Sequence, residues 1–109
     1  MAGDRVLGDI ATKLLLENDR VRIWEFRLEP GERSPVHRHD LDYVMIQISG
    51  DRVAADFEPD SKDQWGAAGA RVEGEVSPGL ALYSTRGGVE TAVNTGDKPF
   101  YEIVVELKD

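Results

Sequence analysis

The sequence predicts an all-β fold, a small antiparallel β-barrel or sandwich of about eight or nine strands. Short segments rich in apolar and β-branched residues recur along the whole chain, and glycine, proline, aspartate and asparagine residues separate them. Helical periodicity is weak throughout, and at most the segment 9–16 would open with a turn of helix. Short strands at regular spacing with frequent turn residues are typical of β-sandwiches and β-barrels.

The first two strands are expected at Lys13–Glu17 and 20–29. The second strand alternates, with Trp24, Phe26 and Leu28 on one face and charged residues on the other. We interpret this apolar face as part of the core or of a subunit contact. A proline and a glycine follow the strand and favour a turn, because proline fixes φ and glycine tolerates positive φ.

The middle of the chain predicts two more strands and a long loop. Asp42–Ser49 carries apolar residues on both faces and ends at Gly50, and Arg52–Phe57 follows directly. The segment 58–69 is rich in small and polar residues, so we expect a mobile loop that Trp65 would anchor. Turn residues separate four further strands, which are predicted at 70–76, 80–84, Val89–Asn94 and Phe100–Leu107.

Composition places the chain among ordinary globular proteins. It has 109 residues, of which 40% are apolar and 31% charged, so we expect one domain over residues 1–109 with its core at about 14–107. The formal net charge of −8 disfavours binding to nucleic acids or to anionic membranes. No apolar run is long enough to span a bilayer and no signal peptide is recognised, so we expect a cytoplasmic protein. The absence of cysteine excludes disulfides, thiolate zinc sites and thiol nucleophiles.

The two histidines of the chain, His37 and His39, are separated by one residue. In a strand, residues two apart share a face and lie about 6.5–7 Å apart, so both imidazoles can bind one metal ion at about 2.0–2.1 Å. The alternative interpretation is a pair of surface histidines that binds nothing, and for the pattern alone it is the more common one.

The surroundings of the two histidines resemble the first sequence motif of the cupin superfamily. That motif has a glycine, five residues, His-x-His, three or four residues, a glutamate, six residues and a glycine. The corresponding residues here are Gly31, His37, His39, Tyr43 and Gly50, so only the glutamate position differs.

The second cupin motif is only partly present. It has Pro-x-Gly, two residues, a histidine, three residues and an asparagine. The corresponding residues here are Thr85, Gly87, Glu90 and Asn94, so Thr85 replaces the proline and Glu90 replaces the histidine. The chain is most similar to short single-domain cupins, including those associated with β-alanine degradation.

The resemblance covers about residues 14–107, and it implies a cupin β-barrel, or jelly roll, whose metal is held by three histidines and one glutamate. His37 and His39 are carried over as ligands, while Glu90 stands where the third histidine would point inward. Two imidazoles and one carboxylate resemble the facial triad that holds iron(II) with open positions. We expect a divalent metal ion at His37, His39 and Glu90, with iron favoured over manganese, nickel, copper or zinc. In the alternative interpretation, the replacement of two of the four ligands abolishes metal binding, and Glu90 is a solvated acid at the rim of the barrel.

Tyr43, at the position of the missing glutamate, has three interpretations. Its phenol could hydrogen-bond a substrate or a metal-bound water, or donate a proton. It could instead bind a ferric ion as a phenolate, or it could be a core aromatic residue with a satisfied hydroxyl. Asp42 would replace the glutamate only if a bulge shifted the register of the strand.

Gln47 is the second candidate catalytic residue, because alternation from Tyr43 directs its side chain into the barrel. A buried amide needs hydrogen-bond partners, which we expect to be water, a ligand or a neighbour such as Asn94. Glu102 and Glu106 share one strand face, and we interpret them as a solvated edge.

The sequence favours a small metal-binding cupin that acts on a small organic molecule. The leading hypothesis is a non-heme metal enzyme, either an oxidoreductase of the dioxygenase type or an isomerase or lyase, with Tyr43 and Gln47 as acid/base or orienting groups. The alternative is a pocket that binds a small ligand without chemistry, or an accessory cupin whose metal site is degraded. We expect a homodimer, since a barrel of this size gains buried area by pairing.

Overall fold

The computed structural model describes residues 5–109, and between those bounds the chain forms nine β-strands. They are β1 (Lys13–Glu17), β2 (Val21–Leu28), β3 (His37–Arg38), β4 (Asp42–Ser49), β5 (Arg52–Phe57), β6 (Arg71–Glu75), β7 (Ala81–Ser84), β8 (Val89–Asn94) and β9 (Phe100–Leu107). The helical turn expected within 9–16 is wrong, because residues 10–12 form bends that lead directly into β1. Within residues 5–109, no helix is long and apolar enough to cross a membrane.

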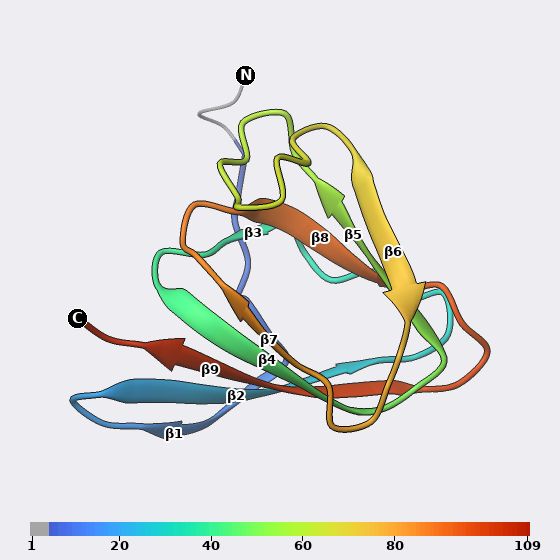
Figure 1. Ribbon diagram of the computed structural model, residues 1–109, viewed down its shortest axis with the longest axis horizontal. Helices are drawn as coiled ribbons and strands as arrows, with labels where there is room; N and C mark the ends of the chain where they lie inside the picture. The colour runs from blue at the N-terminus through green and yellow to red at the C-terminus, as the bar shows by residue number, and fades with distance from the viewer. Residues whose placement is uncertain (1–4) are drawn as a thin grey trace.

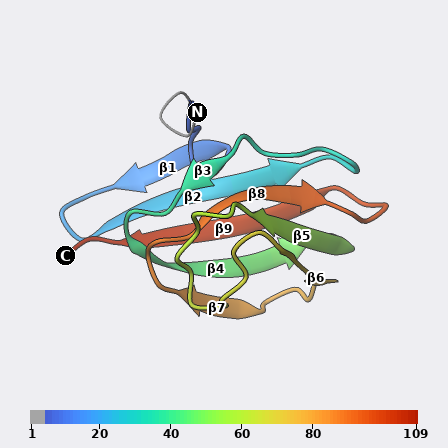
Figure 2. The ribbon, with the colours of Figure 1, turned by 90° about the horizontal axis from the view of Figure 1, so that it is seen from above.

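The strands form two antiparallel sheets that face each other (Figure 1). The five-stranded sheet has the order β1-β2-β9-β4-β7, and the four-stranded sheet has the order β3-β8-β5-β6. The chain crosses between the sheets, so strands that are distant in the sequence lie side by side, as Figure 2 shows for β2 and β9. This arrangement confirms the predicted antiparallel barrel or jelly roll.

The core lies between the inward faces of the two sheets. Residues of β9 alternate between buried and half-buried along the whole strand, as expected for a sheet with one covered face. Phe26 and Leu28 of β2 are buried together with Phe100 and Val104 of β9, and the rings of Phe26 and Phe100 pack edge to face with centroids 6.3 Å apart. The predicted inward face of β2 is therefore confirmed for Phe26 and Leu28, whereas Trp24 is half-buried and packs against the margin of the core.

All three glycines of the cupin-like motifs have a positive φ, and at Gly50 and Gly87 a Cβ would also meet close neighbours. Gly50, between β4 and β5, has a φ of +143°, and a Cβ there would lie 3.2 Å from Phe100 and 3.3 Å from Val76. Gly87 has a φ of +108°, and a Cβ there would lie 2.6 Å from the backbone oxygen of Lys62. Both positions require a residue without a side chain, and Gly87 sets the course of the chain into β8.

The predicted loop over 58–69 connects β5 to β6 and contains turns only. The hydroxyl of Ser61 donates to Asp63 at 2.8 Å and accepts the backbone N–H of Val89 at 3.0 Å. These contacts hold the loop against the start of β8. Trp65 is 46% exposed, so it borders the interior without being buried in it.

Candidate metal centre

Backbone pairing brings the two histidines and Glu90 together. β3 is only two residues long, and it pairs with the start of β8 so that His37 is directly opposite Glu90. Two backbone hydrogen bonds extend this alignment beyond the strand, from the N–H of His39 to the carbonyl of Gly88 and from the N–H of Gly87 to the carbonyl of His39, each at 2.9 Å. The extended geometry expected for the histidine pair is therefore present, although the strand itself is short.

The three side chains converge on one carboxylate oxygen. Nε2 of His39 lies 3.1 Å from Oε1 of Glu90, and Nε2 of His37 lies 3.7 Å from the same oxygen. One ligand atom from each residue lies within 4.8 Å of the others, and all three residues are buried. Atoms that bind one ion at about 2.0–2.2 Å are roughly 3 Å apart, so this group could hold a metal ion with small adjustments.

A hydrogen bond sets the orientation of the His37 ring. Its Nδ1 lies 3.1 Å from the carbonyl oxygen of Pro35, which can only accept, so Nδ1 carries a proton and Nε2 is directed toward Glu90. Histidines that bind metals through Nε2 are commonly held in this way. Nδ1 of His39 is buried without a partner among the residues that the structure describes, so no such contact fixes the tautomer of the second ring.

Glu90 contributes a negative charge to this group. Burial alone would raise the pKa of its carboxyl, but hydrogen bonds and electrostatic attraction from His37 and His39 lower the pKa to about 2. Since Nε2 of His39 and Nε2 of His37 both face this carboxylate, the arrangement is favourable only with protons on these nitrogens or with a cation among the three groups. Two imidazole nitrogens and one carboxylate oxygen are a donor set that fits a divalent transition metal.

Tyr43 lies beside the metal-binding group rather than within it. Its ring stacks on the ring of His39, with centroids 3.9 Å apart and planes inclined by 12°. Burial raises the pKa of the Tyr43 phenol well above its ordinary value, and the charge of Glu90 adds to this effect. The neutral phenol is therefore the stable form in the metal-free protein. Asp42 does not replace the missing glutamate, because its carboxylate accepts hydrogen bonds from Arg86 at 2.9 and 3.1 Å.

Gln47 is buried and lines the interior, as strand alternation predicts. Its Oε1 accepts a hydrogen bond from the backbone N–H of Ser77 at 2.8 Å. Of the partners expected for Gln47, Asn94 is not one, because the Asn94 amide donates to the carbonyls of Leu28 and Lys98 at 3.0 and 2.8 Å. Asn94 therefore fixes the turn after β8, and Gln47 is available to the interior.

A cavity of about 350 Å³ extends between the two sheets and is bordered by His37, His39 and Glu90. Its wall is mostly apolar, with Phe26, Met45, Val53, Leu82, Phe100 and Val104 among the residues that form it. Within the described part of the chain, no lysine or arginine lines it. A small molecule in this cavity would reach the metal-binding group from its apolar side.

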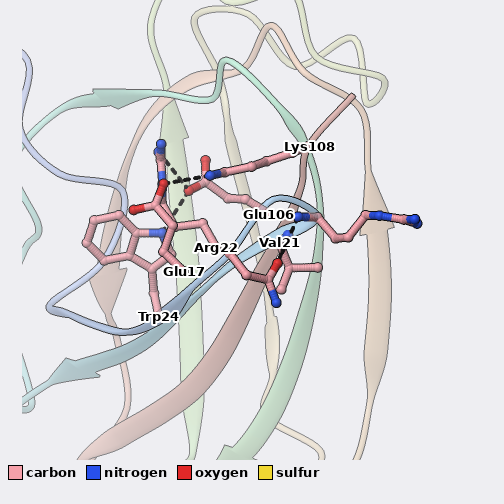
Figure 3. A network of polar contacts seen from close by, with 8 residues as sticks. Glu17, Val21, Arg22, Trp24, Glu106 and Lys108 are labelled. Atoms are coloured by element: carbon pink, nitrogen blue, oxygen red, sulfur yellow. Dashed lines mark hydrogen bonds and ion pairs between the residues drawn. The ribbon is translucent and has the colours of Figure 1, made fainter.

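The prediction that Glu102 and Glu106 form a solvated edge is wrong. Both residues are on the inward face of β9, and they are 7% and 3% exposed. Glu106 accepts hydrogen bonds from the indole N–H of Trp24 at 2.7 Å and from Arg22 at 3.4 Å, and Arg22 also contacts Glu17 (Figure 3). Glu106 is thus part of a polar network at one end of the five-stranded sheet.

Glu102 is the interior residue that sequence reasoning missed. It borders the cavity, and it shares the inward face of β9 with Phe100 and Val104. The alternation of that strand around these two apolar residues was the signal that could have located it.

Comparison with known proteins identifies the fold. No protein-family model and no curated protein matches the sequence. A cupin domain from Bordetella pertussis Tohama I is 21% identical, with a TM-score of 0.72 over 94% of this chain and 100% of that one. An RmlC-like cupin family protein with a double-stranded β-helix fold from Methanocaldococcus jannaschii is 18% identical, with a TM-score of 0.64 over 88% of this chain and 77% of that one. The polyketide cyclase RemF from Streptomyces resistomycificus is 23% identical, with a TM-score of 0.58 over 84% of this chain and 57% of that one. The chain is therefore a small barrel with the cupin fold.

Proposed function

We propose that this protein is a metal-dependent enzyme that acts on a small organic molecule, with a divalent metal ion held by His37, His39 and Glu90. The observation that carries the proposal is the convergence of both Nε2 atoms on one oxygen of Glu90, at 3.1 and 3.7 Å. Iron(II) is the favoured ion, because two imidazoles and one carboxylate leave positions open for other ligands. When bound, the metal would supply Lewis-acid or oxygen-activating chemistry.

Two residues of the chain would act on the substrate beside the metal. Tyr43 would keep its phenolic proton and donate a hydrogen bond, because burial disfavours the phenolate. Gln47 would orient the substrate through its Nε2 amide, since its Oε1 is held by Ser77. The apolar wall of the cavity would exclude water from both groups.

The cupin fold supports several reaction classes. One solved structure of this fold belongs to a polyketide cyclase, which supports an activity on small organic molecules. We propose a dioxygenase or an isomerase or lyase, and the facial donor set favours the dioxygenase.

A second candidate function is a pocket that binds a small ligand without chemistry. One observation favours it. The resemblance to cupins implies four metal ligands, whereas the structure gathers three and stacks Tyr43 on His39 at the fourth position.

Metal analysis of protein purified without an affinity tag tests the metal proposal. We expect about one equivalent of a divalent transition metal in the wild type and less than a tenth of that in His37→Ala and Glu90→Gln. Asp40→Asn is the matched control, because Asp40 is an exposed carboxylate next to His39 in the sequence that pairs with Arg38. Equal metal contents in all four proteins would contradict the proposal.

Oxygen consumption separates the enzyme from the binding module. The iron-loaded protein is assayed with a panel of small ketones and carboxylic acids, and Glu90→Gln is the control. Substrate-dependent oxygen uptake that Glu90→Gln lacks is expected for a dioxygenase. Binding of panel members without uptake or any product would favour the second candidate.

We also propose that two copies of the chain pair through the outward face of the five-stranded sheet. This face carries Ile23 of β2, Val44 and Ile46 of β4, and Ile103 and Val105 of β9, which are neighbours in the strand register. The outward face of an antiparallel sheet is usually polar when water covers it, and contiguous apolar patches mark interaction sites. We further propose that the protein is cytoplasmic and that it binds neither nucleic acids nor anionic membranes. The net charge of −8 supports the absence of these two kinds of partner.

A further inference from the structure

The cavity contains a buried carboxyl group that the proposed metal centre does not use. Glu102 is 7% exposed and borders the cavity. Within the part of the chain that the structure describes, burial and the charge of Glu90 are the influences on this carboxyl, and no residue donates a hydrogen bond to it. Glu106 on the same strand is instead engaged by Trp24 and Arg22 (Figure 3). Since buried polar groups nearly always have a partner, Glu102 is available to a ligand.

Gln47 supplies a second polar group beside Glu102. The register pairs the two residues across β4 and β9, and such cross-strand neighbours have Cβ atoms about 4.5–5.5 Å apart. Oε1 of Gln47 is occupied by the N–H of Ser77. The described residues provide no acceptor for the Nε2 of Gln47, so its N–H groups are also available in the cavity.

One aromatic side chain connects these two residues to the metal-binding group. Phe26 lies directly opposite Glu102 on β2. Its ring also packs edge to face against the ring of His37, with centroids 6.5 Å apart. The pair Glu102 and Gln47 and the metal-binding group therefore both lie near the Phe26 ring. One small molecule could contact both.

The charges around the cavity restrict what it can bind. Burial raises the pKa of Glu102 to about 8, and the charge of Glu90 adds to this effect. Glu102 is therefore a neutral carboxyl at neutral pH, and a neutral carboxyl can donate a hydrogen bond. The other titratable groups that border the cavity are His37, His39 and Glu90 of the metal-binding group, Tyr43 of β4, and Glu73 and Glu75 of β6. A substrate carboxylate would find no lysine or arginine among the described lining residues. Beside Glu102, an amine would find a neutral acid and therefore no opposite charge.

We propose that Glu102 and Gln47 form a carbonyl-binding subsite, and that the substrate is a small, largely apolar molecule with a neutral carbonyl oxygen. The O–H of Glu102 and an N–H of Gln47 donate to this oxygen. The remainder of the molecule occupies the apolar part of the cavity and reaches the metal-binding group. This proposal rests on the proposed function, because it places the substrate of that enzyme.

Two probes of nearly the same shape test the subsite. Acetophenone carries a carbonyl oxygen where α-methylstyrene carries a methylene group, and ligand-observed NMR titration measures the binding of each to metal-free protein. We expect Glu102→Leu to weaken the binding of acetophenone about tenfold without weakening that of α-methylstyrene. Glu102→Gln keeps a donor and should bind acetophenone within about threefold of the wild type. Equal losses for both probes, or no loss for acetophenone, would overturn the proposal.

Infrared spectroscopy of the wild type tests the subsite without any variant. Donation from Glu102 lowers the carbonyl stretching frequency of bound acetophenone relative to that of the ketone in hexane, and an unshifted band would overturn the proposal. Metal analysis of the same proteins separates this result from the proposed function. Glu102→Leu should bind metal like the wild type, so a failure of metal binding in the wild type would contradict the metal centre alone.

Discussion

His39 and Tyr43 are stacked, with ring centroids 3.9 Å apart and planes inclined by only 12°. Tyr43 stands at the position where the cupin motif has a glutamate, and its ring covers one face of the His39 imidazole. Stacking restricts the rotation of the His39 ring, for which the described residues provide no hydrogen bond at Nδ1. Tyr43 is therefore expected to contribute to metal binding by orienting a ligand.

Removing the Tyr43 hydroxyl and removing its ring should have different effects on metal affinity. Tyr43→Phe keeps the stack, so we expect an affinity within about twofold of the wild type. Tyr43→Ala removes a contact worth about 1 kcal/mol and should weaken metal binding roughly fivefold. Competition with a chromophoric chelator measures both. If Tyr43→Phe lost the metal as fully as Tyr43→Ala, the hydroxyl itself would be a ligand.

The metal-free protein should lose stability in acid through Glu90. The folded state lowers the pKa of this carboxyl from 4.5 to about 2, so its contribution is present above about pH 4.5 and is lost as the pH falls toward 2. The loss should be about 3 kcal/mol in the free energy of unfolding. Urea titrations between pH 5 and pH 2 measure it, and Glu90→Gln should show a smaller decrease over the same range.

Through Glu102, the stability of the protein should fall as the pH rises, which is opposite to the effect of Glu90. Its pKa is raised from 4.5 to about 8 in the folded state, so the stability that its protonated form contributes is fully present below about pH 4.5 and is lost as the pH rises toward 8. The loss is at most about 5 kcal/mol. Glu102→Gln cannot ionise and should be more stable than the wild type at pH 8.5, as thermal melts would show. A wild type with constant stability between pH 5 and pH 8.5 would refute this prediction.

Gly50 should tolerate no side chain. Gly50→Ala places a Cβ 3.2 Å from Phe100 and 3.3 Å from Val76 at a φ of +143°, so we expect a loss of about 1–3 kcal/mol in the free energy of unfolding. Gly74→Ala is the control, because nothing lies within 4 Å of a Cβ there. The control should be nearly neutral in the same urea titration. Equal losses in the two variants would show that the contact with Phe100 is unimportant.

A charge on the outward face of the five-stranded sheet should separate the proposed dimer. Ile46→Lys introduces an ammonium group next to Ile103, where pairing would bury it at a cost of several kcal/mol. Sedimentation velocity should show a dimer for the wild type and a monomer for Ile46→Lys. Val6→Lys, at a position that is 86% exposed, should remain dimeric. A wild type that sediments as a monomer at all concentrations would contradict the proposal.

Strand positions were readily predicted because turn residues delimit them. Lys13–Glu17 and Arg52–Phe57 are strands with the bounds that the sequence predicts. The strand at the histidines is the exception, since β3 is only two residues long. Pro30 and Pro35 precede His37, and apolar and polar residues do not alternate regularly there. β3 is aligned by its pairing with β8, which forms only when the barrel closes.

The convergence of His37, His39 and Glu90 was predicted from the resemblance to cupin motifs, whereas Glu102 was not. Alternation assigns a residue to a face of a strand, but it does not tell how deeply that face is buried. Because two charged residues share one face of the last strand, the sequence favoured the interpretation of that face as a solvated edge. The closure of β2 and β4 around β9 covers that face, and this is a long-range effect. The narrower similarity to cupins of β-alanine degradation stays a prediction.

His39 and Glu90 are 51 positions apart in the sequence, and their contact exists only after β3 has paired with β8. In the denatured chain the ligand atoms of His37, His39 and Glu90 are far apart. An ion that binds all three at once therefore stabilises only the native state. A bound cation would consequently act as a reversible cross-link between the two halves of the polypeptide. Supply of that ion in the cell would then set not only catalytic output but also how long each molecule survives proteolysis.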